Sequence, residues 1–156
     1  MEFGLNDTLE LKRKVLIFSL NENLFGVNVS DLTEVNRIAE YRQVEKGPDW
    51  IVGMINFHGK TTPILNLKCL LAIEPSTLAP KAKWLAIPYD DMFVCLAVDD
   101  VKHFMDPERH IIDEMPSVAD RPEVKYIKCY ARIEDTLVPV LDFRTILSDC
   151  GLRIAD

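Results

Sequence analysis

The chain has 156 residues, of which 48% are hydrophobic and 28% are charged, and its net charge is −7. These values are typical of one or two small globular domains and exclude a disordered chain. The acidic balance also argues against nucleic acid as a partner, because such affinity depends mainly on clustered Lys and Arg. The basic run Lys12-Arg13-Lys14 is too short to supply it.

The four cysteines lie in apolar segments and show no metal-ligand spacing; they are Cys69, Cys95, Cys129 and Cys150. This is typical of small hydrophobic side chains in a reducing compartment. The first residues are acidic and contain no apolar core of a secretory signal. No apolar run approaches the ~20 residues that a membrane span needs. We therefore expect a cytoplasmic protein that does not insert directly into the membrane.

The first half of the chain predicts two hairpins after a polar N-terminal arm at 1–13. The expected strands are rich in β-branched and aromatic residues and are bounded by turns; they cover 14–20, 24–29, 51–57 and 63–65. Ser30 is placed to cap a short helical turn over 30–35, and Asn66 to cap a helix that begins at Leu67.

The second half repeats this order after a linker rich in proline, at 74–83. The strands expected here cover 84–89, 92–98, 124–133 and 137–141. Asp90-Asp91 forms the first turn, the segment 99–103 echoes the short helical turn, and Asp142 caps a last helix through Leu147.

Segments of the two halves also match residue by residue. Residues 63–71 match 139–147 at an offset of 76, whereas 15–18 and 25–32 match residues that lie 69 positions later. An insertion of seven residues between 105 and 123 reconciles the two offsets. The preserved order favours an internal duplication over chance matches between apolar strands.

Short strands at regular spacing, with two short helices, indicate an all-β protein. Because closure removes exposed sheet edges, we expect two small five-stranded SH3/OB-like barrels packed around a shared hydrophobic core. The first barrel is placed at about 14–73 and the second at about 84–147, and a crossing of the chain ends between them is left open. Together they form one domain at 14–150, followed by a C-terminal tail at 151–156.

No residue set for catalysis, cofactor binding or metal binding can be assembled from this sequence. His58, His103 and His110 lack the spacing of a metal site or a nucleophile motif. We interpret His103 as half-buried packing and His110 as a solvated loop residue. The acidic pairs 90–91 and 99–100 are better explained as a hairpin turn and a helix cap than as acid–base groups.

What remains is a surface for protein partners. His58 lies at the tip of a predicted turn, where binding residues are often held on a rigid scaffold. Asn56 is polar within an apolar strand, and we expect its side chain to hold the turn by bonding the backbone. Glu34 has the alternative reading of a solvated charge, and Leu32 that of a core residue.

Residues 52–67 resemble the signature of the CheW-like coupling proteins of bacterial chemotaxis, roughly Gly-x-x-Asn-Leu-Arg-Gly followed by Pro-Val and Asp-Leu. Three further segments fit the same family: Phe25-Gly26-Val27, Leu32-x-Glu34-Val35 and Leu137-Val138-Pro139-Val140-Leu141-Asp142. The resemblance covers about residues 14–150 and is loosest from 105 to 124.

The resemblance implies two small five-stranded barrels, no enzymatic activity and no cofactor. It implies a cytoplasmic scaffold, recruited to chemoreceptor arrays, that joins the regulatory domain of a CheA-type histidine kinase to the cytoplasmic tip of a receptor. Contact with other CheW-like proteins in array rings is a further implication. By matching motif, the partner-binding residues would be Leu32, Glu34, Gly53, Asn56 and His58.

The chain departs from the family at the centre of its motif. His58 stands where the family usually has Arg, and Phe57 where it has Leu. Arg carries a permanent charge and a fork of donors, whereas His is smaller and about neutral near pH 7. An alternative function is therefore a divergent scaffold that binds the kinase or the array without standard receptor coupling. A small-barrel protein that binds nucleic acid is the alternative from another class.

Overall fold

The computed structural model describes residues 3–4, 14–37, 41–43, 47–106, 111–112, 124–133 and 135–150. Its strands are β1 (Phe3–Gly4), β2 (Val15–Leu20), β3 (Asn23–Asn28), β4 (Glu34–Arg37), β5 (Ile51–Phe57), β6 (Lys60–Asn66), β7 (Lys83–Tyr89), β8 (Met92–Val98), β9 (Asp100–Met105), β10 (Ile111–Ile112), β11 (Ile127–Ile133) and β12 (Thr136–Leu141). Its helical segments are short: η1 (Val29–Asp31), α2 (Leu67–Leu70), η3 (Val124–Tyr126) and α3 (Phe143–Asp149). The prediction of a mainly β protein with short helices is confirmed.

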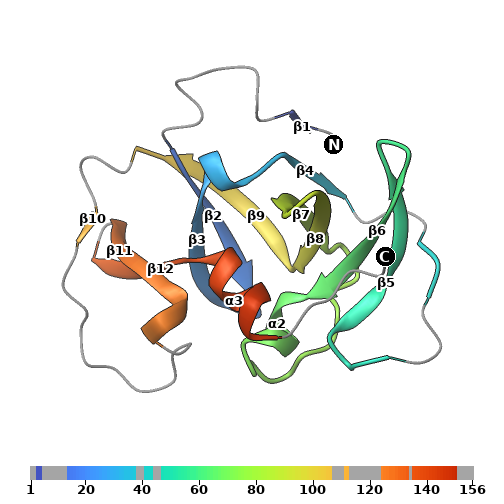
Figure 1. The fold of residues 1–156 in the computed structure, drawn as a ribbon. Coiled ribbons are helices and arrows are strands. Elements are labelled where there is room, and N and C mark those ends of the chain that lie inside the picture. Colours follow the sequence, from blue (N-terminus) through green and yellow to red (C-terminus); the bar gives the residue numbers. More distant parts are fainter. Residues whose placement is uncertain are drawn as a thin grey trace.

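The described strands form two six-stranded sheets (Figure 1). One sheet has the order β1-β4-β7-β8-β6-β5, and the other has the order β10-β11-β12-β3-β2-β9. Each sheet thus takes strands from both halves of the chain, and a parallel pair, β6 with β8 or β3 with β12, joins the two contributions. The sheets therefore do not coincide with the predicted ranges 14–73 and 84–147, and the chain does cross between them.

The predicted closure of each unit into a barrel is wrong. In the described part of the chain, β5 ends the first sheet and β9 ends the second, and no ladder joins these strands to the opposite edge. The free edge of β5 instead meets an isolated bridge, in which Arg42 and Met54 exchange two backbone hydrogen bonds of 2.8 and 2.9 Å. The two edges of each sheet are thus not hydrogen-bonded to each other, and packed side chains occupy the concave side of the sheet.

The registers of the two halves agree position by position. Cys95 lies opposite Ile64 in one parallel pair, and Gly26 lies opposite Val140 in the other. Gly26 and Cys95 are 69 residues apart, and Ile64 and Val140 are 76 apart. Both predicted offsets therefore describe equivalent places in the fold, and the pairing supports an internal duplication over a chance resemblance.

The irregularities of the sheets repeat as well. The ladder between β5 and β6 shifts between Ile51 and Gly53, and that between β11 and β12 shifts between Ile127 and Cys129. The offset of 69 holds as far as β9 and the offset of 76 holds from β11 onward. The seven additional residues of the second half therefore lie between these two strands, which agrees with the predicted range.

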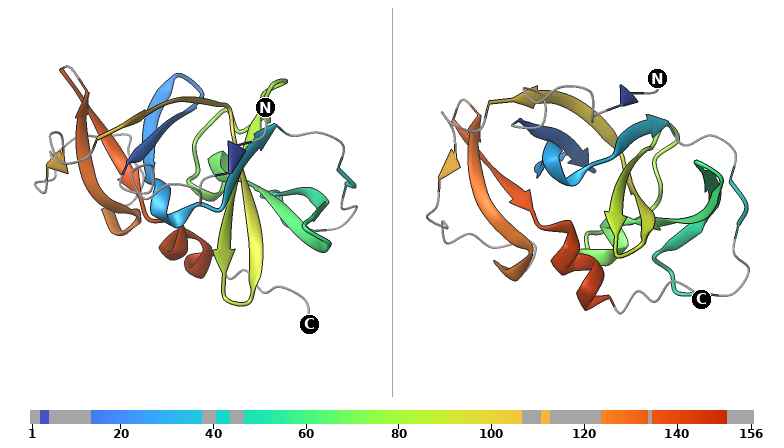
Figure 2. Two further views of the ribbon diagram at one scale, coloured as in Figure 1. Left: turned by 90° about the horizontal axis from the view of Figure 1, so that it is seen from above. Right: turned by 45° about the horizontal axis from the view of Figure 1, so that its top comes forward.

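The main core lies between the two sheets, with β11 and β12 on one side, β5 and β6 on the other, and α3 between them (Figure 2). Phe18 lies near its centre, with its ring centroid 6.1 Å from those of both Phe25 and Phe143. All three side chains are at most 4% exposed. Burial of one such side chain contributes about 1.5–3 kcal/mol, so this core is the main source of stability.

Each sheet also buries its second face in a smaller cluster of its own. In β2, Leu16 and Phe18 face the main core, whereas Val15 and Ile17 join a cluster with residues of β11 and β12. The first sheet has the corresponding cluster around Phe57 and Trp84. Burial of both faces explains why β2 is apolar without alternation, apart from the buried Ser19.

Two of the predicted helix caps, Asn66 and Asp142, are confirmed. The side chain of Asn66 accepts a hydrogen bond from the N–H of Lys68 at the start of α2, and that of Asp142 accepts one from the N–H of Thr145 in α3. The helix predicted to begin at Leu67 and the helix predicted through Leu147 follow these caps.

The predicted helical turn over 30–35 is wrong beyond its first residues. The 3-10 turn η1 ends at Asp31, and its N-cap is Asn28, without a side-chain hydrogen bond. The N–H of Thr33 then donates to the carbonyl of Ala86 at 2.7 Å, and this bond directs the chain into the sheet as β4. The segment 99–103 was predicted to repeat this helical turn, but from Asp100 onward it belongs to the strand β9.

Candidate functional site

The structure brings two of the five predicted partner-binding residues into direct contact. The Nε2 atom of His58, at the turn between β5 and β6, lies 3.4 Å from Oε1 of Glu34 at the start of β4. The His58 side chain is 60% exposed, but the Glu34 side chain is only 11% exposed. The alternative reading of Glu34 as a solvated charge is therefore wrong, because its carboxylate is held against the hairpin tip.

The Glu34 carboxylate has a second polar neighbour on its own strand. Nδ2 of Asn36 donates to Oε2 of Glu34 at 3.3 Å. The two carboxylate oxygens thus face an amide on one side and an imidazole on the other. A partner that changes the position of His58 alters the surroundings of a nearly buried charge, and such a change is costly unless a new partner for that charge is supplied.

Asn56 shapes the turn that carries His58. The N–H of Gly59 donates to Oδ1 of Asn56 at 2.9 Å, as the sequence predicted, although Asn56 is exposed and not buried. His58 and Gly59 have φ values of +51° and +82°. Two successive residues with positive φ are typical of a tight hairpin turn that matches the twist of the strands, so Asn56 and Gly59 fix the direction in which His58 projects.

An aromatic cluster supports the hairpin tip from below. The ring of Phe57 lies 4.2 Å from that of His58, 5.5 Å from that of Trp84 and 5.1 Å from that of Phe93, all at steep angles. Such edge-to-face contacts add about 0.5–1.5 kcal/mol each to the burial of the rings. In the sequence, Phe57 stands out only as a departure from the family, because Trp84 and Phe93 are distant from it along the chain.

Gly53 and Leu32 are both buried, so each contributes to the shape of the site and not to its exposed surface. An added Cβ at Gly53 would lie 2.5 Å from the carbonyl oxygen of Arg42 and 2.6 Å from Cδ2 of Tyr41, so glycine permits the close approach of residues 41–43. Leu32 is 4% exposed and belongs to the main core, as its alternative reading held.

A groove borders the hairpin beside Asn56. It has a volume of about 470 Å³ and is lined by Tyr41, Arg42, Met54, Ile55, Asn56 and Thr61. Arg42, Asn56 and Thr61 are exposed, whereas Met54 and Ile55 are partly buried. The lining of the groove combines apolar and polar side chains, a composition that suits contacts with another protein.

The remaining titratable residues supply no catalytic set in the described part of the chain. Burial and, after it, the charge of Glu34 raise the pKa of the Cys95 thiol well above its usual range, which leaves that thiol neutral and unreactive. His103 is exposed and not half-buried, and His110 lies outside the described residues. Asp90-Asp91 forms a hairpin turn as predicted. The described residues contain no group of His, Cys, Asp and Glu that could hold a metal.

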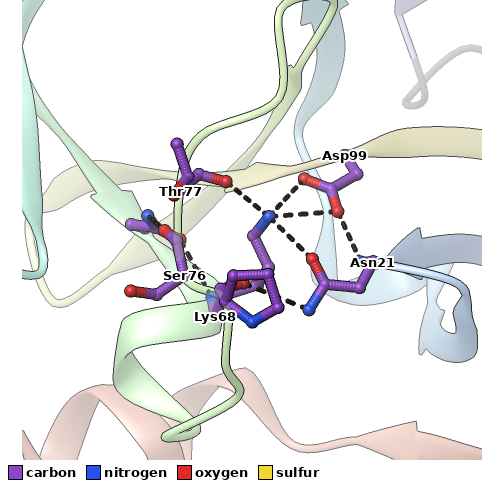
Figure 3. A network of polar contacts seen from close by, with 7 residues as sticks. Asn21, Lys68, Ser76, Thr77 and Asp99 are labelled. Carbon is purple, nitrogen blue, oxygen red and sulfur yellow. Dashed lines mark hydrogen bonds and ion pairs between the residues drawn. The ribbon is translucent and has the colours of Figure 1, made fainter.

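Sequence reasoning missed a buried polar cluster around Lys68 (Figure 3). The Nζ atom of Lys68 lies 2.9 Å from Oδ1 of Asp99, and it donates to the carbonyl of Thr77 at 2.6 Å and to Oδ1 of Asn21 at 3.2 Å. The Lys68 side chain is 4% exposed. Asp99, interpreted as a helix cap, is therefore the ion-pair partner of Lys68.

The same cluster binds the linker between the two halves. Nδ2 of Asn66 donates to the carbonyl of Ser76 at 2.7 Å, and Nδ2 of Asn21 donates to that of Pro75 at 3.1 Å. These contacts depend on residues far apart in the sequence, so no local pattern indicated them.

The described helices are all too short or too polar to cross a membrane.

The fold defines a class of small two-sheet β proteins that includes a known scaffold. The structure superposes on the scaffolding protein TtCheW from Thermoanaerobacter tengcongensis with a TM-score of 0.74. The match covers 87% of this chain and 88% of that one at 22% identity, a likeness of fold. The profile of the CheW-like domain matches residues 14–150, and the chain belongs to this family.

Related sequences extend the likeness over nearly the whole chain. The chemotaxis protein CheW of Bacillus subtilis is 21% identical over 142 residues, which cover 90% of this chain and 91% of that protein. The protein PilI of Pseudomonas aeruginosa is 29% identical over 90 residues, which cover 56% of this chain and 51% of PilI.

Proposed function

We propose that this protein is a non-enzymatic scaffold of a bacterial chemosensory array. The observation that carries the proposal is the match of the CheW-like domain over residues 14–150, joined to a fold shared with a scaffolding protein. The name of the Bacillus subtilis relative supports a role in chemotaxis. The protein would be cytoplasmic and would reach the membrane through its partners.

The proposed partners are the regulatory domain of a CheA-type histidine kinase and the cytoplasmic tip of a chemoreceptor. The scaffold would hold both at once, so that a receptor state that binds it differently also biases the kinase. The hairpin tip suits such a contact because Asn56 and the aromatic cluster around Phe57 hold the His58 side chain in one direction. A rigid tip loses little conformational entropy when a partner binds.

Within this site, we assign direct partner contact to His58 and Asn56 and to the exposed edge of the Glu34 carboxylate. Gly53 and Leu32 act indirectly, because both are buried. Gly53 admits the segment 41–43, and Leu32 anchors the start of β4 in the main core. Their substitution would alter partner binding through the shape of the site.

A scaffold that binds the kinase or the array without standard receptor coupling is the second candidate. It is favoured by His58, which replaces the arginine of the family motif and pairs with Glu34 through a single atom contact at 3.4 Å. An arginine could offer Glu34 two parallel donors and a permanent charge. A contact of this kind with a receptor would be weaker here than in a protein with Arg.

The test is binding of the purified protein, separately, to the kinase regulatory domain and to a receptor-tip fragment by titration calorimetry. Variants His58→Arg and His58→Ala are measured beside Lys60→Ala, a matched control at an exposed residue of the same hairpin. We expect binding to both partners, loss of about tenfold in receptor affinity for His58→Ala, and little change for Lys60→Ala, as expected for a central against a peripheral contact.

The outcomes separate the two candidates. A gain in receptor affinity for His58→Arg would identify His58 as a weakened receptor contact in a true coupling protein. Binding to the kinase domain alone would favour the scaffold without receptor coupling. Binding to neither partner would reject both functions and leave only the fold in common with the family.

A further inference from the structure

We propose that the second half of the molecule holds a docking site for an uncharged, non-helical peptide segment of a partner protein, bound through its backbone. The site is a cavity of about 70 Å³ at the start of α3, and its lining includes Ser30, Asp142 and Arg144. It shares no residue with the Glu34–His58 contact, so this inference goes beyond the proposed function and is tested without it.

The first half of the molecule shows what the equivalent residues bind. At the offset of 76, Asn66 and Lys68 are the counterparts of Asp142 and Arg144. Nδ2 of Asn66 donates to the carbonyl of Ser76 at 2.7 Å, and Nζ of Lys68 donates to that of Thr77 at 2.6 Å (Figure 3). Both acceptors belong to the backbone of the linker, which is neither helix nor strand there. The molecule thus contains this arrangement once already, with a segment of chain held by its carbonyls.

The two helices end differently, and this leaves the second site accessible. After α2 ends at Leu70, Ala72 turns the chain back with a φ of +57°, and the linker then returns to Lys68. The helix α3 continues instead to Asp149, more than one turn beyond Arg144. Arg144 is exposed, and among the described residues none forms a hydrogen bond or ion pair with its guanidinium.

The charges of the lining favour a peptide backbone over a free ion. Asp31 and Lys128 already pair with each other at 2.9 Å, which leaves one acid, Asp142, and one base, Arg144. The Asp142 carboxylate accepts two hydrogen bonds from Thr145, so about two of its four acceptor positions remain. A peptide offers a carbonyl to Arg144 and an N–H to Asp142, whereas an anion or a cation satisfies only one of them.

The cavity also has the size and the exposure that such a segment needs. Its volume exceeds the ~10–15 Å³ that a single water requires. Ile87 and Phe143 contribute buried apolar side chains to the lining, whereas Ser30, Pro88 and Arg144 are exposed. A few polar groups among apolar ones are typical of a binding site, and the exposed residues make this one reachable from the surface.

The experiment titrates the full chain with a capped peptide, acetyl-Pro-Ser-Thr-Leu-Ala-amide, which has the sequence of residues 75–79. Amide NMR shifts locate the binding and give its affinity. The titration extends to about 10 mM, because the tethered linker has an effective concentration in the mM range that a free peptide lacks. Arg144→Ala removes the free donor, and Arg132→Ala is the matched control, an exposed arginine that does not line the cavity. The same peptide made of D-amino acids is the control for backbone recognition.

We expect the peptide to shift the amides of Ser30, Arg144 and Thr145. Its affinity should fall by about tenfold for Arg144→Ala, because a hydrogen bond from a charged donor is lost, and should be unchanged for Arg132→Ala. The D-peptide should cause no such shifts at the same concentration.

Three results would overturn the proposal. One is the absence of shifts up to about 10 mM, and another is equal affinity for Arg144→Ala and Arg132→Ala or for the two peptides. The third is a set of shifts confined to Asn66 and Lys68, which would mean that the peptide replaces the linker in the first half. Neither the kinase nor the receptor takes part, so each of these results leaves the proposed function intact.

Discussion

Lys68 and Arg144 occupy the same position in the two halves of the molecule, yet their surroundings differ completely. Both follow a helix-capping residue, Asn66 or Asp142, by two positions. Lys68 is 3% exposed and binds the linker and Asp99, whereas Arg144 is exposed. The fold thus holds a buried positive charge in its first half and an exposed positive charge at the equivalent position of its second half.

Two differences accompany this contrast: the linker of the first half, and Asp99, whose counterpart in the other half is the uncharged Ser30. In the first half, the linker passes over the helix start, and its carbonyls at Pro75, Ser76 and Thr77 accept hydrogen bonds. In the second half, Asp142 and Arg144 line a small cavity of about 70 Å³ together with Ser30, which is the counterpart of Asp99. The difference teaches that equivalent positions of a duplicated fold diverge where the side chains and segments packed against them differ.

The largest expected effect comes from removing the buried charge. Lys68→Met leaves Asp99, whose side chain is 13% exposed, without its ion-pair partner, and we expect a loss of about 3–5 kcal/mol in the free energy of unfolding. Arg144→Met should change it by no more than about 0.5 kcal/mol. Urea denaturation of both variants measures the difference.

The double variant Lys68→Met/Asp99→Leu sharpens this comparison. It removes both charges, so it should recover much of the lost stability. Equal losses for Lys68→Met and Arg144→Met would show that the linker cluster does not depend on the charge of Lys68.

A second contrast concerns Gly53 and its counterpart Cys129, which lie at equivalent bulges. Gly53→Ala forces a Cβ against the Arg42 carbonyl, and we expect it to cost about 1–3 kcal/mol, because the obstacle is backbone. Cys129→Ala should cost no more than about 1 kcal/mol, since that position already accepts a side chain. Thermal unfolding provides the measurement, and a neutral Gly53→Ala would mean that residues 41–43 move away freely.

The hairpin tip gives a smaller effect. Asn56→Ala removes the acceptor for the Gly59 N–H, and we expect a loss of about 0.5–1.5 kcal/mol in the free energy of unfolding. The counterpart Arg132 is exposed on β11, and Arg132→Ala should be nearly neutral. Denaturation curves that fail to distinguish these two variants would remove the structural role assigned to Asn56.

The sequence predicted those features that are local or that repeat. The helix caps Asn66 and Asp142 and the Asn56-held turn involve atoms at most three residues apart, so residue type and spacing were sufficient. The offsets of 69 and 76 predicted equivalent positions because a shared register preserves residue size and polarity.

What the sequence did not indicate depends on pairing between distant segments. Ser30 as a possible cap favoured a helical turn, but the bond from Thr33 to Ala86 directed this segment into a strand. Tertiary context overrode a weak local preference, as it commonly does. The burial of Glu34, and the open sheets in place of barrels, follow from the same long-range pairing.

The smallest expected effect concerns Asp100 and its counterpart Asp31, which pair with different lysines. Asp31 accepts from Nζ of Lys128 at 2.9 Å, whereas Asp100 contacts Lys83 on β7. The hydrogen bond from Lys83 holds the pKa of the Asp100 carboxyl below its usual range. The stabilisation is therefore present above the unfolded pKa of about 4 and is lost as the pH falls through the lower folded value.

Because the Asp100 side chain is 43% exposed, solvent screening limits the effect to a few tenths of a kcal/mol. Asp100→Asn should accordingly lower stability slightly at pH 7 and match the unsubstituted protein near pH 2, as measured by urea denaturation at both pH values. An unchanged difference between the two proteins from pH 7 to pH 2 would assign the loss to packing and not to the charge.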